Sequence, residues 1–416
     1  MSKIVILGTL DTKAEEVAYL KAEVEALGYK TLVVDIGFGG TPSLEADLDR
    51  RAVAAAAGSS LDAISSRLRS EGVGAEEWAS RLMAEGAAKL LRELHERGLV
   101  AGVVGIGGTM GSFMASEAMR ALPFGVPKLL VTTQASSPRA PLYVGSEDIT
   151  VMNTVSDLIG LNWMTKTVLA SAARAIVGMA SKAPPRPERP LIGATGLGTT
   201  PCIMKAGELL DKMGYELIPF HATGSGGRAF EALIRRGLFK GVLDLALHEV
   251  ANEVFGGCHV AGPGRLMGAG TMGIPQVVAP GALCIICYTT LEEVPPQYRS
   301  RTWRHNPYTY VVDLARDELV KLGEVVAERL NLAKGPTKVL VPLRGWYGPG
   351  LTAPEKPKHE DCEAFLKSLR RRLRPEVEVE AVDAHINDLK FAEHAVSSLL
   401  ELMRSSGHEP WPQAAR

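Results

Sequence analysis

The chain has few cysteines, almost no net charge and no long uninterrupted apolar segment, and each shortage excludes a class of protein. Five cysteines in 416 residues are too few for a disulfide scaffold, and their odd number leaves at least one unpaired. The 46 basic and 47 acidic residues leave a net charge of −1, so no overall field draws the protein to nucleic acid or to an anionic membrane. The most apolar later stretch, residues 273–288, is interrupted by two prolines and a glycine and is too broken to span a bilayer.

The N-terminus also lacks the pattern of a secretory signal. Met1, Ser2 and Lys3 are followed directly by an apolar strand, without a basic region, a long apolar stretch and a cleavage site. Together with the sparse cysteines, this predicts a cytoplasmic protein. The 46% of hydrophobic and 22% of charged residues are ordinary for a folded protein, and the length predicts two large domains or three small ones.

A proline-rich segment divides the chain. Residues 181–190 contain four prolines and show no apolar periodicity, which is typical of a linker. We therefore predict an N-terminal domain over residues 1–182, a linker over 183–190, a C-terminal domain over 191–406 and a loose tail over 407–416.

The two halves begin with the same order of elements. Residues 4–7 and 31–36 predict buried strands with an amphipathic helix between them, and residues 191–194 and 216–220 repeat this order in the second half. Strands that alternate with helices predict an α/β fold in which each half is a doubly wound parallel sheet. Only the first half carries a helical insertion, residues 41–99.

Loops rich in glycine and hydroxyl side chains follow the strands of the first half. They are residues 8–13, 35–41, 105–112 and 132–137. In open α/β sheets, ligands bind outside the carboxyl ends of the strands. Glycines let the backbone come close, hydroxyls add donors and helix N-termini favour negative charge, so the four loops together suit a polyphosphate.

Charged residues in these loops suggest how such a ligand is held. Lys13 is placed to meet a terminal phosphate, and either Asp11 or the pair Glu147 and Asp148 is placed to hold Mg²⁺. The chain has no Walker A motif, and no Gly-x-Gly-x-x-Gly follows its first strand. The loops therefore predict an anionic ligand without identifying it, and each loop taken singly is also an ordinary turn.

The second half holds the candidates for catalysis. His221 ends a predicted strand before a glycine-rich loop, where catalytic groups of α/β enzymes lie, so it is the candidate general acid or base. Glu249 also follows a strand and is its candidate partner or a metal ligand. Arg301 and His305 lie in a predicted loop and suit the binding of a carboxylate. Structural hydrogen bonding is the alternative for each histidine.

The spacing of Cys284 and Cys287 has the form of a metal or redox motif. In an apolar strand, however, residues three apart point to opposite faces. We therefore do not expect the two sulfur atoms to share one ion or to form a disulfide.

Several motifs occur together in one known family. They are Gly8-Thr-Leu-Asp-Thr-Lys13, Val34-Asp-Ile-Gly37, Gly105-Ile-Gly-Gly108, Val144-Gly-Ser-Glu-Asp-Ile149, Phe220-His-Ala-Thr-Gly-Ser-Gly-Gly-Arg228, Arg304-His-Asn-Pro307 and Asp383-Ala-His-Ile-Asn-Asp388. Over almost its whole length the chain resembles the Tm-one-like ATP-binding family, the family of the tomato mosaic virus resistance protein. The resemblance implies two Rossmann-like domains, a homodimer and a site for ATP and Mg²⁺ in the N-terminal domain.

The resemblance also implies which residues form that site. The nucleotide contacts would be Thr9, Asp11, Lys13, Gly37, Gly107, Gly108, Thr109, Gly111, Ser112, Thr133 and Ser136. The candidate metal ligands, chosen from the residues and not from the resemblance, are Asp11 and Asp148. Where the family's third loop often reads Gly-Gly-Ser-Gly-Gly, this chain carries Met110.

Three functions follow as hypotheses. The first is an ATP- and Mg²⁺-binding enzyme that acts on a small carboxylated or oxo-acid metabolite in a cleft between the two domains. The second is a nucleotide-gated binding or regulatory protein without turnover, in which substitution of His221 and Glu249 changes nothing. The third is a nucleotide-sugar enzyme, which UDP-sugars rather than ATP would stabilise.

Overall fold

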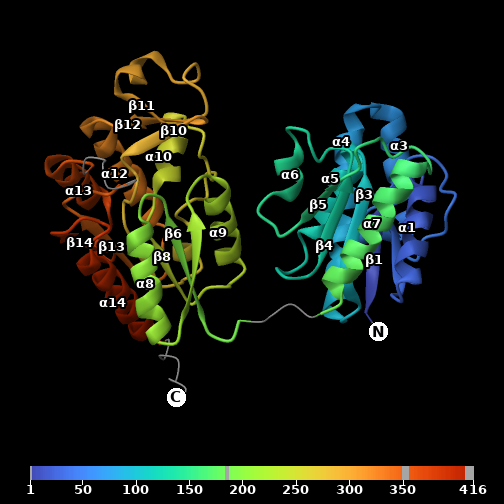
Figure 1. Ribbon diagram of the computed structural model, residues 1–416, viewed down its shortest axis with the longest axis horizontal. Helices are drawn as coiled ribbons and strands as arrows, with labels where there is room; N and C mark the ends of the chain where they lie inside the picture. Colours follow the sequence, from blue (N-terminus) through green and yellow to red (C-terminus); the bar gives the residue numbers. More distant parts are fainter. Residues whose placement is uncertain (1, 183–186, 349–355, 408–416) are drawn as a thin grey trace. The chain divides into compact units, whose positions relative to one another are not determined.

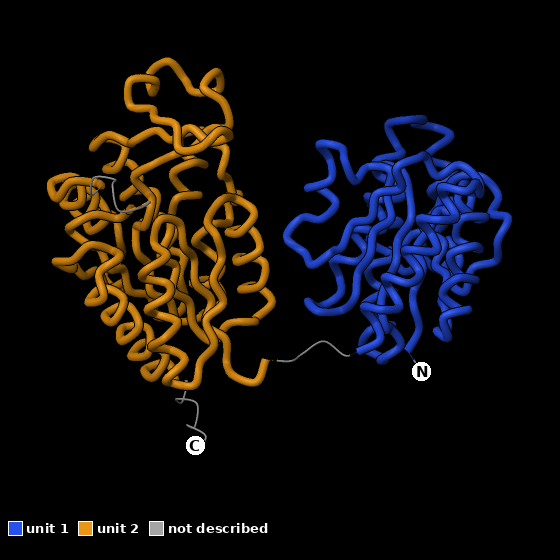
Figure 2. Tube along the Cα trace, in the orientation of Figure 1, with its two compact units in different colours: residues 1–186 blue, residues 187–416 orange. Residues whose placement is uncertain are grey.

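The computed structural model describes residues 2–182, 187–348 and 356–407 and divides into two compact units (Figures 1 and 2). Unit 1 comprises residues 1–186 and unit 2 residues 187–416. Each unit has a parallel sheet with helices on both faces, as the sequence predicts. Part of the predicted linker, 183–186, and part of the predicted tail, 408–416, lie outside the described residues. Among the helices of the described ranges, none combines the length and the apolar character needed to cross a membrane.

Unit 1 is built on a five-stranded parallel sheet with the order β2-β1-β3-β4-β5. Its strands are β1 (Lys3–Gly8), β2 (Thr31–Asp35), β3 (Val100–Gly107), β4 (Lys128–Thr132) and β5 (Thr150–Asn153). Every residue of β2 and β4 is buried, as a parallel sheet covered on both faces requires. Gly8 pairs with Asp35 in register, so neighbouring strands end at the same edge.

Alternate residues of β1 feed two separate cores in unit 1. Ile4 and Ile6 pack with α1 (Ala14–Ala26) and α7 (Trp163–Ala180), whereas Val5 and Leu7 belong to the core on the other face. That second core is covered by α2 (Arg50–Ala56), α3 (Leu61–Glu71), α4 (Gly74–Glu96) and α5 (Thr109–Met119). The helical insertion therefore supplies much of one face of the sheet.

Unit 2 is built on a six-stranded parallel sheet with the order β14-β13-β9-β8-β6-β7. Its strands are β6 (Leu191–Gly196), β7 (Glu216–His221), β8 (Gly241–Asp244), β9 (Gln276–Val278), β13 (Thr337–Pro342) and β14 (Glu378–Val382). One face packs against α8 (Thr200–Lys212) and α14 (Leu389–Ser405). The other packs against α9 (Ser225–Arg235), α10 (His248–Phe255), α12 (Arg316–Leu330) and α13 (His359–Arg372).

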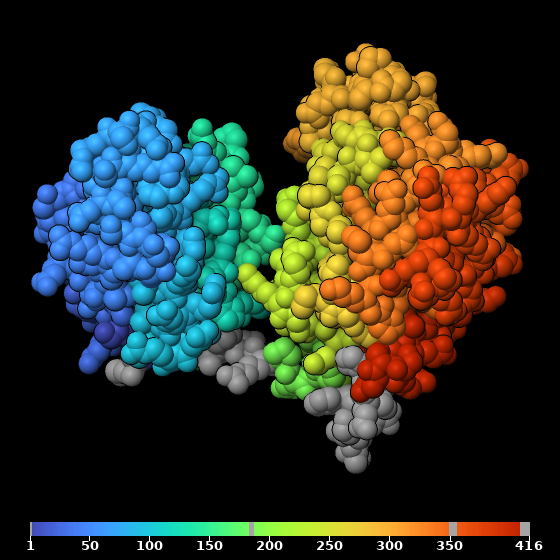
Figure 3. Space-filling model, turned by 180° about the vertical axis from the view of Figure 1, so that it is seen from behind, coloured from blue at the N-terminus to red at the C-terminus, as the bar shows by residue number. Residues whose placement is uncertain are grey.

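A small antiparallel sheet, β10-β12-β11, adds to unit 2. It consists of β10 (Ile285–Tyr288), β11 (Thr302–Asn306) and β12 (Thr309–Asp313), preceded by the 3-10 helix η1 (Pro296–Arg301). Figure 3 shows the segment around residues 290–310 protruding at one end of the unit. The prediction that Arg301 and His305 lie in a loop is therefore wrong, because Arg301 is the last residue of η1 and His305 lies in β11.

Candidate functional site

The loops after β1, β3 and β4 meet at the carboxyl edge of the unit 1 sheet. A Cβ placed on Gly111 would lie 3.8 Å from Cγ2 of Thr9, and one placed on Gly108 would lie 3.8 Å from Oγ1 of Thr133. Residues from three strand ends are thus neighbours. This arrangement is the one that places a ligand over the end of an open α/β sheet.

The N-terminus of α5 lies within this group. Gly108 is its N-cap residue and Thr109 its first residue, so the backbone N–H groups of the first turn have no partner inside the helix and carry a partial positive charge. A Cβ on Gly107 would lie 2.8 Å from the backbone of Gly111, so glycine is required for this tight turn. The side chain of Met110 is 38% exposed. The edge therefore presents donors suited to an anionic group.

Lys13 and Asp11 flank these donors. Lys13 precedes α1 and its Nζ donates to the carbonyl oxygen of Thr12 at 3.4 Å; among the described residues no carboxylate pairs with it. Oδ2 of Asp11 accepts from the backbone N–H of Gly39 at 2.8 Å, while Oδ1 has only a 3.5 Å contact with the hydroxyl of Thr12. One carboxylate oxygen and one cation are thus available to a ligand.

The loop after β2 is held by a buried ion pair. Oδ2 of Asp35 accepts from Nε of Arg50 at 2.8 Å, and Oδ1 accepts from the backbone N–H of Gly37 at 2.9 Å. Arg50 also donates to the carbonyl oxygens of Gly39 and Gly40. Because Asp35 already takes the N–H of Gly37, this glycine shapes the loop rather than donating to a ligand.

Two predicted contacts on the later loops differ in exposure. The hydroxyl of Ser112 is fully buried. It donates to the carbonyl oxygen of Gly107 at 3.1 Å and lies 2.6 Å from the hydroxyl of Thr132, so its hydrogen bonds stabilise the loop. Ser136 is exposed and accepts from Nδ2 of Asn153 at 3.2 Å.

Asp148 lies at the opposite edge of the sheet. It precedes β5 and accepts from Nζ of Lys128, the first residue of β4, at 2.6 Å and from the backbone N–H of Gly125 at 2.7 Å. The Lys128 side chain is fully buried, so Asp148 neutralises a buried charge. The structure does not bring Asp148 together with Asp11, which follows the carboxyl end of β1.

In unit 2, a buried ionic cluster around Arg265 lies at the carboxyl end of β8, where Asp244 ends the strand. The guanidinium forms two hydrogen bonds with Asp244 and donates from Nε to Oε2 of Glu249 at 2.7 Å. Burial lowers the pKa of Arg265, but Asp244 and Glu249 beside it raise the pKa above its usual range, so it stays charged. Arg265 could not be identified from the sequence, because it lies in a loop without a recognisable motif.

Both carboxylate oxygens of Glu249 already accept hydrogen bonds in this cluster. Its Oε1 accepts from the backbone N–H groups of Gly224 at 2.6 Å and Gly227 at 3.0 Å, and its side chain is fully buried. It therefore fixes the start of α9 next to β7. The described residues show no hydrogen bond between Glu249 and His221.

Arg301 and His305 belong to the antiparallel sheet. Arg301 donates to both oxygens of Glu318 at 2.7 and 3.1 Å and to the carbonyl oxygen of Asp313, and the hydrogen bond to Glu318 raises its pKa. His305 is exposed and packs edge-on against Trp303. A substrate carboxylate would have to compete with Glu318 for Arg301.

The surroundings of His221 include another histidine, His259, rather than Glu249. It is exposed at the end of β7, with Nδ1 3.2 Å from the carbonyl oxygen of Gly196. A Cβ on Gly224, three residues later, would lie 3.4 Å from the carbonyl carbon of His259, so this loop packs on the His259 backbone. Burial lowers the pKa of His259, and His221 lowers it further.

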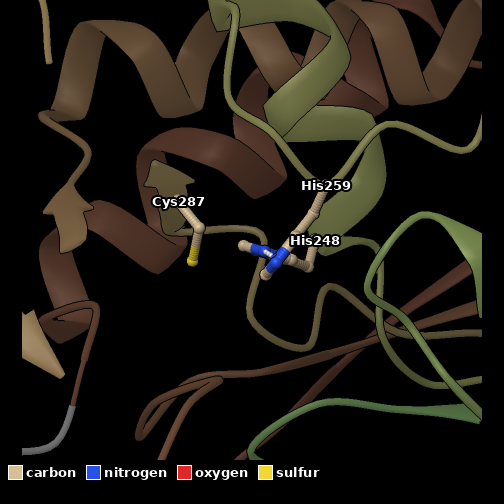
Figure 4. A group of neighbouring side chains, drawn as sticks. All are labelled: His248, His259 and Cys287. Atoms are coloured by element: carbon tan, nitrogen blue, oxygen red, sulfur yellow. Dashed lines mark hydrogen bonds between the residues drawn. The ribbon is translucent and has the colours of Figure 1, made fainter. Parts of the chain in front are cut away.

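His259 in turn meets two buried side chains (Figure 4). Nε2 of His248, the first residue of α10, lies 3.0 Å from Nδ1 of His259. Burial lowers the pKa of His248 to about 3 and raises that of the Cys287 thiol to about 12. The potential ligand atoms of His248, His259 and Cys287 all lie within 4.8 Å of one another, and Cys284 is not in this group.

The fold and these strand-end groups define a protein of two Rossmann-like α/β units. Models of the N-terminal and C-terminal domains of the uncharacterised protein family UPF0261 match residues 2–185 and 189–403. The chain belongs to this family.

The relatives extend over nearly the whole chain. A UPF0261 protein of Clostridium tetani is 39% identical and one of Rhizobium meliloti 36% identical, with 96% and 97% of this chain and 99% of each relative covered. The ToMV susceptible protein tm-1(GCR26) of Solanum lycopersicum is 31% identical over 98% of this chain, which spans 56% of the tomato protein. The resemblance found in the sequence motifs is thus confirmed.

Solved structures show only a weak likeness. A UDP-N-acetylglucosamine 2-epimerase is 11% identical, with 67% of this chain and 79% of that chain covered and a TM-score of 0.22. A glycosyltransferase of Streptomyces sp. SF2575 complexed with thymidine diphosphate is 12% identical, with 98% and 100% covered and a TM-score of 0.18. We draw no functional argument from these likenesses.

Proposed function

We propose that unit 1 binds ATP together with Mg²⁺ at the carboxyl edge of β1, β3 and β4. The observation that carries this proposal is the meeting of Thr9, Gly108, Gly111 and Thr133 around the N-terminus of α5. Backbone N–H groups at a helix N-terminus, flanked by hydroxyls, suit phosphate oxygens. The family resemblance of the motifs adds the adenine nucleotide to this chemistry.

Two charged residues, Lys13 and Asp11, would complete the proposed site. Lys13, which has no carboxylate partner among the described residues, would meet the terminal phosphate. Asp11 would hold Mg²⁺ through Oδ1, since Oδ2 already accepts from Gly39. One carboxylate together with phosphate oxygens and water is a common way for proteins to bind Mg²⁺. Asp148 is not part of this proposed site.

We further propose that unit 2 acts on a small carboxylated or oxo-acid metabolite, with His221 as general acid or base. His221 supports this because it is exposed at the carboxyl end of β7, within reach of solvent and substrate. Glu249 would position the glycine-rich loop after His221 rather than exchange protons.

The second candidate is a nucleotide-gated binding protein without turnover. It is favoured by one observation: two of the four residues expected to act on a substrate are already paired, Glu249 with Arg265 and a backbone N–H group, and Arg301 with Glu318. His221→Ala separates the two functions. If the protein is an enzyme, the substitution abolishes turnover of the metabolite; if it is a binding protein, there is no turnover to lose. ATP binding is unchanged in both cases.

A thermal-shift titration with ATP, ADP and UDP-sugars, with and without Mg²⁺, tests the nucleotide site. A ligand at about 100 times its dissociation constant stabilises the fold by roughly 2.7 kcal/mol. We expect a Mg²⁺-dependent shift with ATP that Lys13→Ala removes and Lys30→Ala keeps, since Lys30 is exposed at the amino end of β2. No shift with any nucleotide contradicts the proposal, and a shift with UDP-sugars alone favours a nucleotide-sugar enzyme.

The homodimer and the cytoplasmic location stay predictions. Light scattering of the purified chain, with and without ATP, checks the first, because a dimer has twice the 44.4 kDa mass of the chain. Fractionation of the source cells checks the second.

A further inference from the structure

We propose that His248, His259 and Cys287 form a binding site for a zinc ion in unit 2, with a fourth coordination position left for water or a substrate oxygen. The three residues come from different elements: the start of α10, the loop after it and strand β10. Imidazole nitrogen and thiolate sulfur are the ligands that zinc prefers in proteins. This inference does not depend on ATP binding in unit 1.

The orientation of His248 is fixed by its surroundings. Its Nδ1 lies 3.0 Å from the carbonyl oxygen of Ile285 and 3.3 Å from that of Ala282. Carbonyl oxygens only accept, so Nδ1 carries the proton and Nε2 keeps its lone pair, which faces His259. A histidine that donates its other N–H to a carbonyl is the usual arrangement of a metal ligand in proteins.

A buried asparagine ties the three positions together. Oδ1 of Asn252 accepts from the backbone N–H of Cys287 at 3.0 Å and from that of His259 at 3.4 Å. Its Nδ2 donates to the carbonyl oxygen of His248 at 2.8 Å. The N–H of Cys258 also donates to the carbonyl oxygen of Cys287 at 2.7 Å, which joins the loop of His259 to β10. The three ligand positions are thus joined by one hydrogen-bonded backbone frame.

The spacing is close to that of a tetrahedral zinc site. With Zn–N distances of about 2.0 Å and a Zn–S distance of about 2.3 Å, ligand nitrogens lie about 3.3 Å apart and sulfur lies about 3.6 Å from them. The two nitrogens here are 3.0 Å apart, and all three ligand atoms lie within 4.8 Å of one another. Side-chain adjustments of less than about 1.5 Å complete the geometry.

Binding replaces the hydrogen bonds that Nε2 of His248 has with Nδ1 of His259 and with Nδ2 of Asn252, each at 3.0 Å, and it releases one proton. Without metal, the N–H at Nδ1 of His259 donates to Nε2 of His248, because the latter carries no proton. In the zinc-bound form the proton of His259 moves to its own Nε2, and both imidazoles bind as neutral ligands. The thiol proton of Cys287 is released to solvent, and the thiolate electron pair binds the ion. No group is oxidised or reduced.

Three protein ligands are the number found in catalytic zinc sites, whereas structural zinc sites have four. The loop that follows His221 packs on the backbone of His259, so this strand end neighbours one of the three ligands. Zinc at this site would lower the pKa of a bound water toward neutral, and His221 would be the candidate acceptor of its proton. The exposed His221 would thereby gain a partner that Glu249 does not provide.

Metal analysis and cobalt spectroscopy of the full chain test this site. We expect one equivalent of zinc in the purified protein and, after removal by chelation, one equivalent of Co²⁺ with the intense absorption of a tetrahedral site and a thiolate-to-cobalt charge-transfer band. Cys287→Ser should remove the charge-transfer band and weaken binding by more than about tenfold. His259→Ala, at a half-buried position, should weaken binding to a similar degree.

The matched controls are the two neighbouring cysteines. Cys284→Ser changes a buried thiol three residues away in the chain and should keep both stoichiometry and spectrum. Cys258→Ser changes an exposed thiol and should do the same. Circular dichroism of each variant confirms folding, and His259→Ala keeps the test decisive where Cys287→Ser fails to fold. Binding below one equivalent, copper in place of zinc, or a charge-transfer band that survives in Cys287→Ser overturns the proposal.

Discussion

An aspartate ends one strand at the carboxyl edge of each parallel sheet, and its surroundings differ between the two units. In unit 1, Asp35 at the end of β2 pairs with Arg50 and fixes one loop, while the neighbouring loops after β1, β3 and β4 keep exposed hydroxyls and backbone donors. In unit 2, Asp244 at the end of β8 and Glu249 after it enclose Arg265, which is fully buried. The same fold therefore offers an open edge with exposed donors in one unit and a closed ionic core in the other.

The difference teaches where chemistry can occur in each unit. Buried groups that already satisfy one another contribute structure and are unavailable to a ligand. In unit 2, His221, His248 and His259 lie outside this ionic core. In unit 1, the same rule leaves Lys13, Asp11 and the first turn of α5.

The largest effect we predict is on the ionic core of unit 2. Arg265→Leu leaves Asp244 and Glu249 buried without a cation, and breaking a buried ion pair in this way costs about 3–5 kcal/mol of unfolding free energy. Urea denaturation followed by circular dichroism measures it. Arg316→Leu, which removes an exposed arginine paired with Glu360 and Asp361, should change the stability little. Equal effects of the two substitutions would contradict the structural role of Arg265.

The next effect separates the two edges of the unit 1 sheet. Asp148→Asn removes the charge that neutralises buried Lys128 and should cost about 1–3 kcal/mol of stability, with the thermal shift by ATP and Mg²⁺ unchanged. Asp11→Asn should do the reverse, because Asp11 makes one backbone hydrogen bond but would hold the ion. Loss of the Mg²⁺-dependent shift in Asp148→Asn would show that the carboxyl edge is not the metal site.

A smaller effect concerns the backbone approach at the start of α5. Gly108 has φ −81°, which any residue adopts, and a Cβ there meets only Thr133 Oγ1 at 3.8 Å. Gly108→Val should therefore fold normally but shield the N–H groups, weakening ATP binding about tenfold, the worth of one charge-assisted hydrogen bond. Isothermal titration calorimetry measures the affinity. Gly40→Val, in open space on the neighbouring loop, is the control. Unchanged affinity in Gly108→Val would rule out close approach of a phosphate.

The smallest effect is expected at Met110. Its side chain is 38% exposed on the first turn of α5 and can turn into solvent when a ligand binds. Met110→Ala should thus change the ATP affinity by less than about threefold, since it removes only partly exposed apolar surface. A tightening of about a hundredfold would mean that the methionine side chain covers the phosphate position in the wild-type protein.

Much of the fold was predictable from the sequence. The buried strands of both sheets read as nearly continuous apolar runs, and the rule that ligands bind at strand carboxyl ends brings Thr9, Gly108 and Thr133 together before any coordinates are known. Cys284 and Cys287 do not share a site, as expected, but the strand argument does not apply because Cys284 precedes β10 and only Cys287 lies in it.

What could not be predicted depends on long-range pairing. Arg50 and Arg265 lie 15 and 21 residues from their aspartate partners, in segments without a motif. His248, His259 and Cys287 come from three elements with no characteristic spacing. Sequence order alone does not tell whether Asp148, which precedes a strand, meets the carboxyl ends of the neighbouring strands, whereas the structure pairs it with Lys128 at the amino end of β4. The hairpin of β11 and β12 is hard to predict because β11 is largely polar and exposed, although β12 buries Val311 and Val312.

Hydrogen–deuterium exchange of the full chain, with and without ATP and Mg²⁺, tests the central claim most directly because it locates the ligand. We predict slower exchange in residues 8–13, 107–112 and 132–137 of unit 1, and no change at the ionic core around Arg265 in unit 2. Protection confined to unit 2, or to the opposite edge around Asp148, would contradict the assignment of the open edge of unit 1 as the nucleotide site.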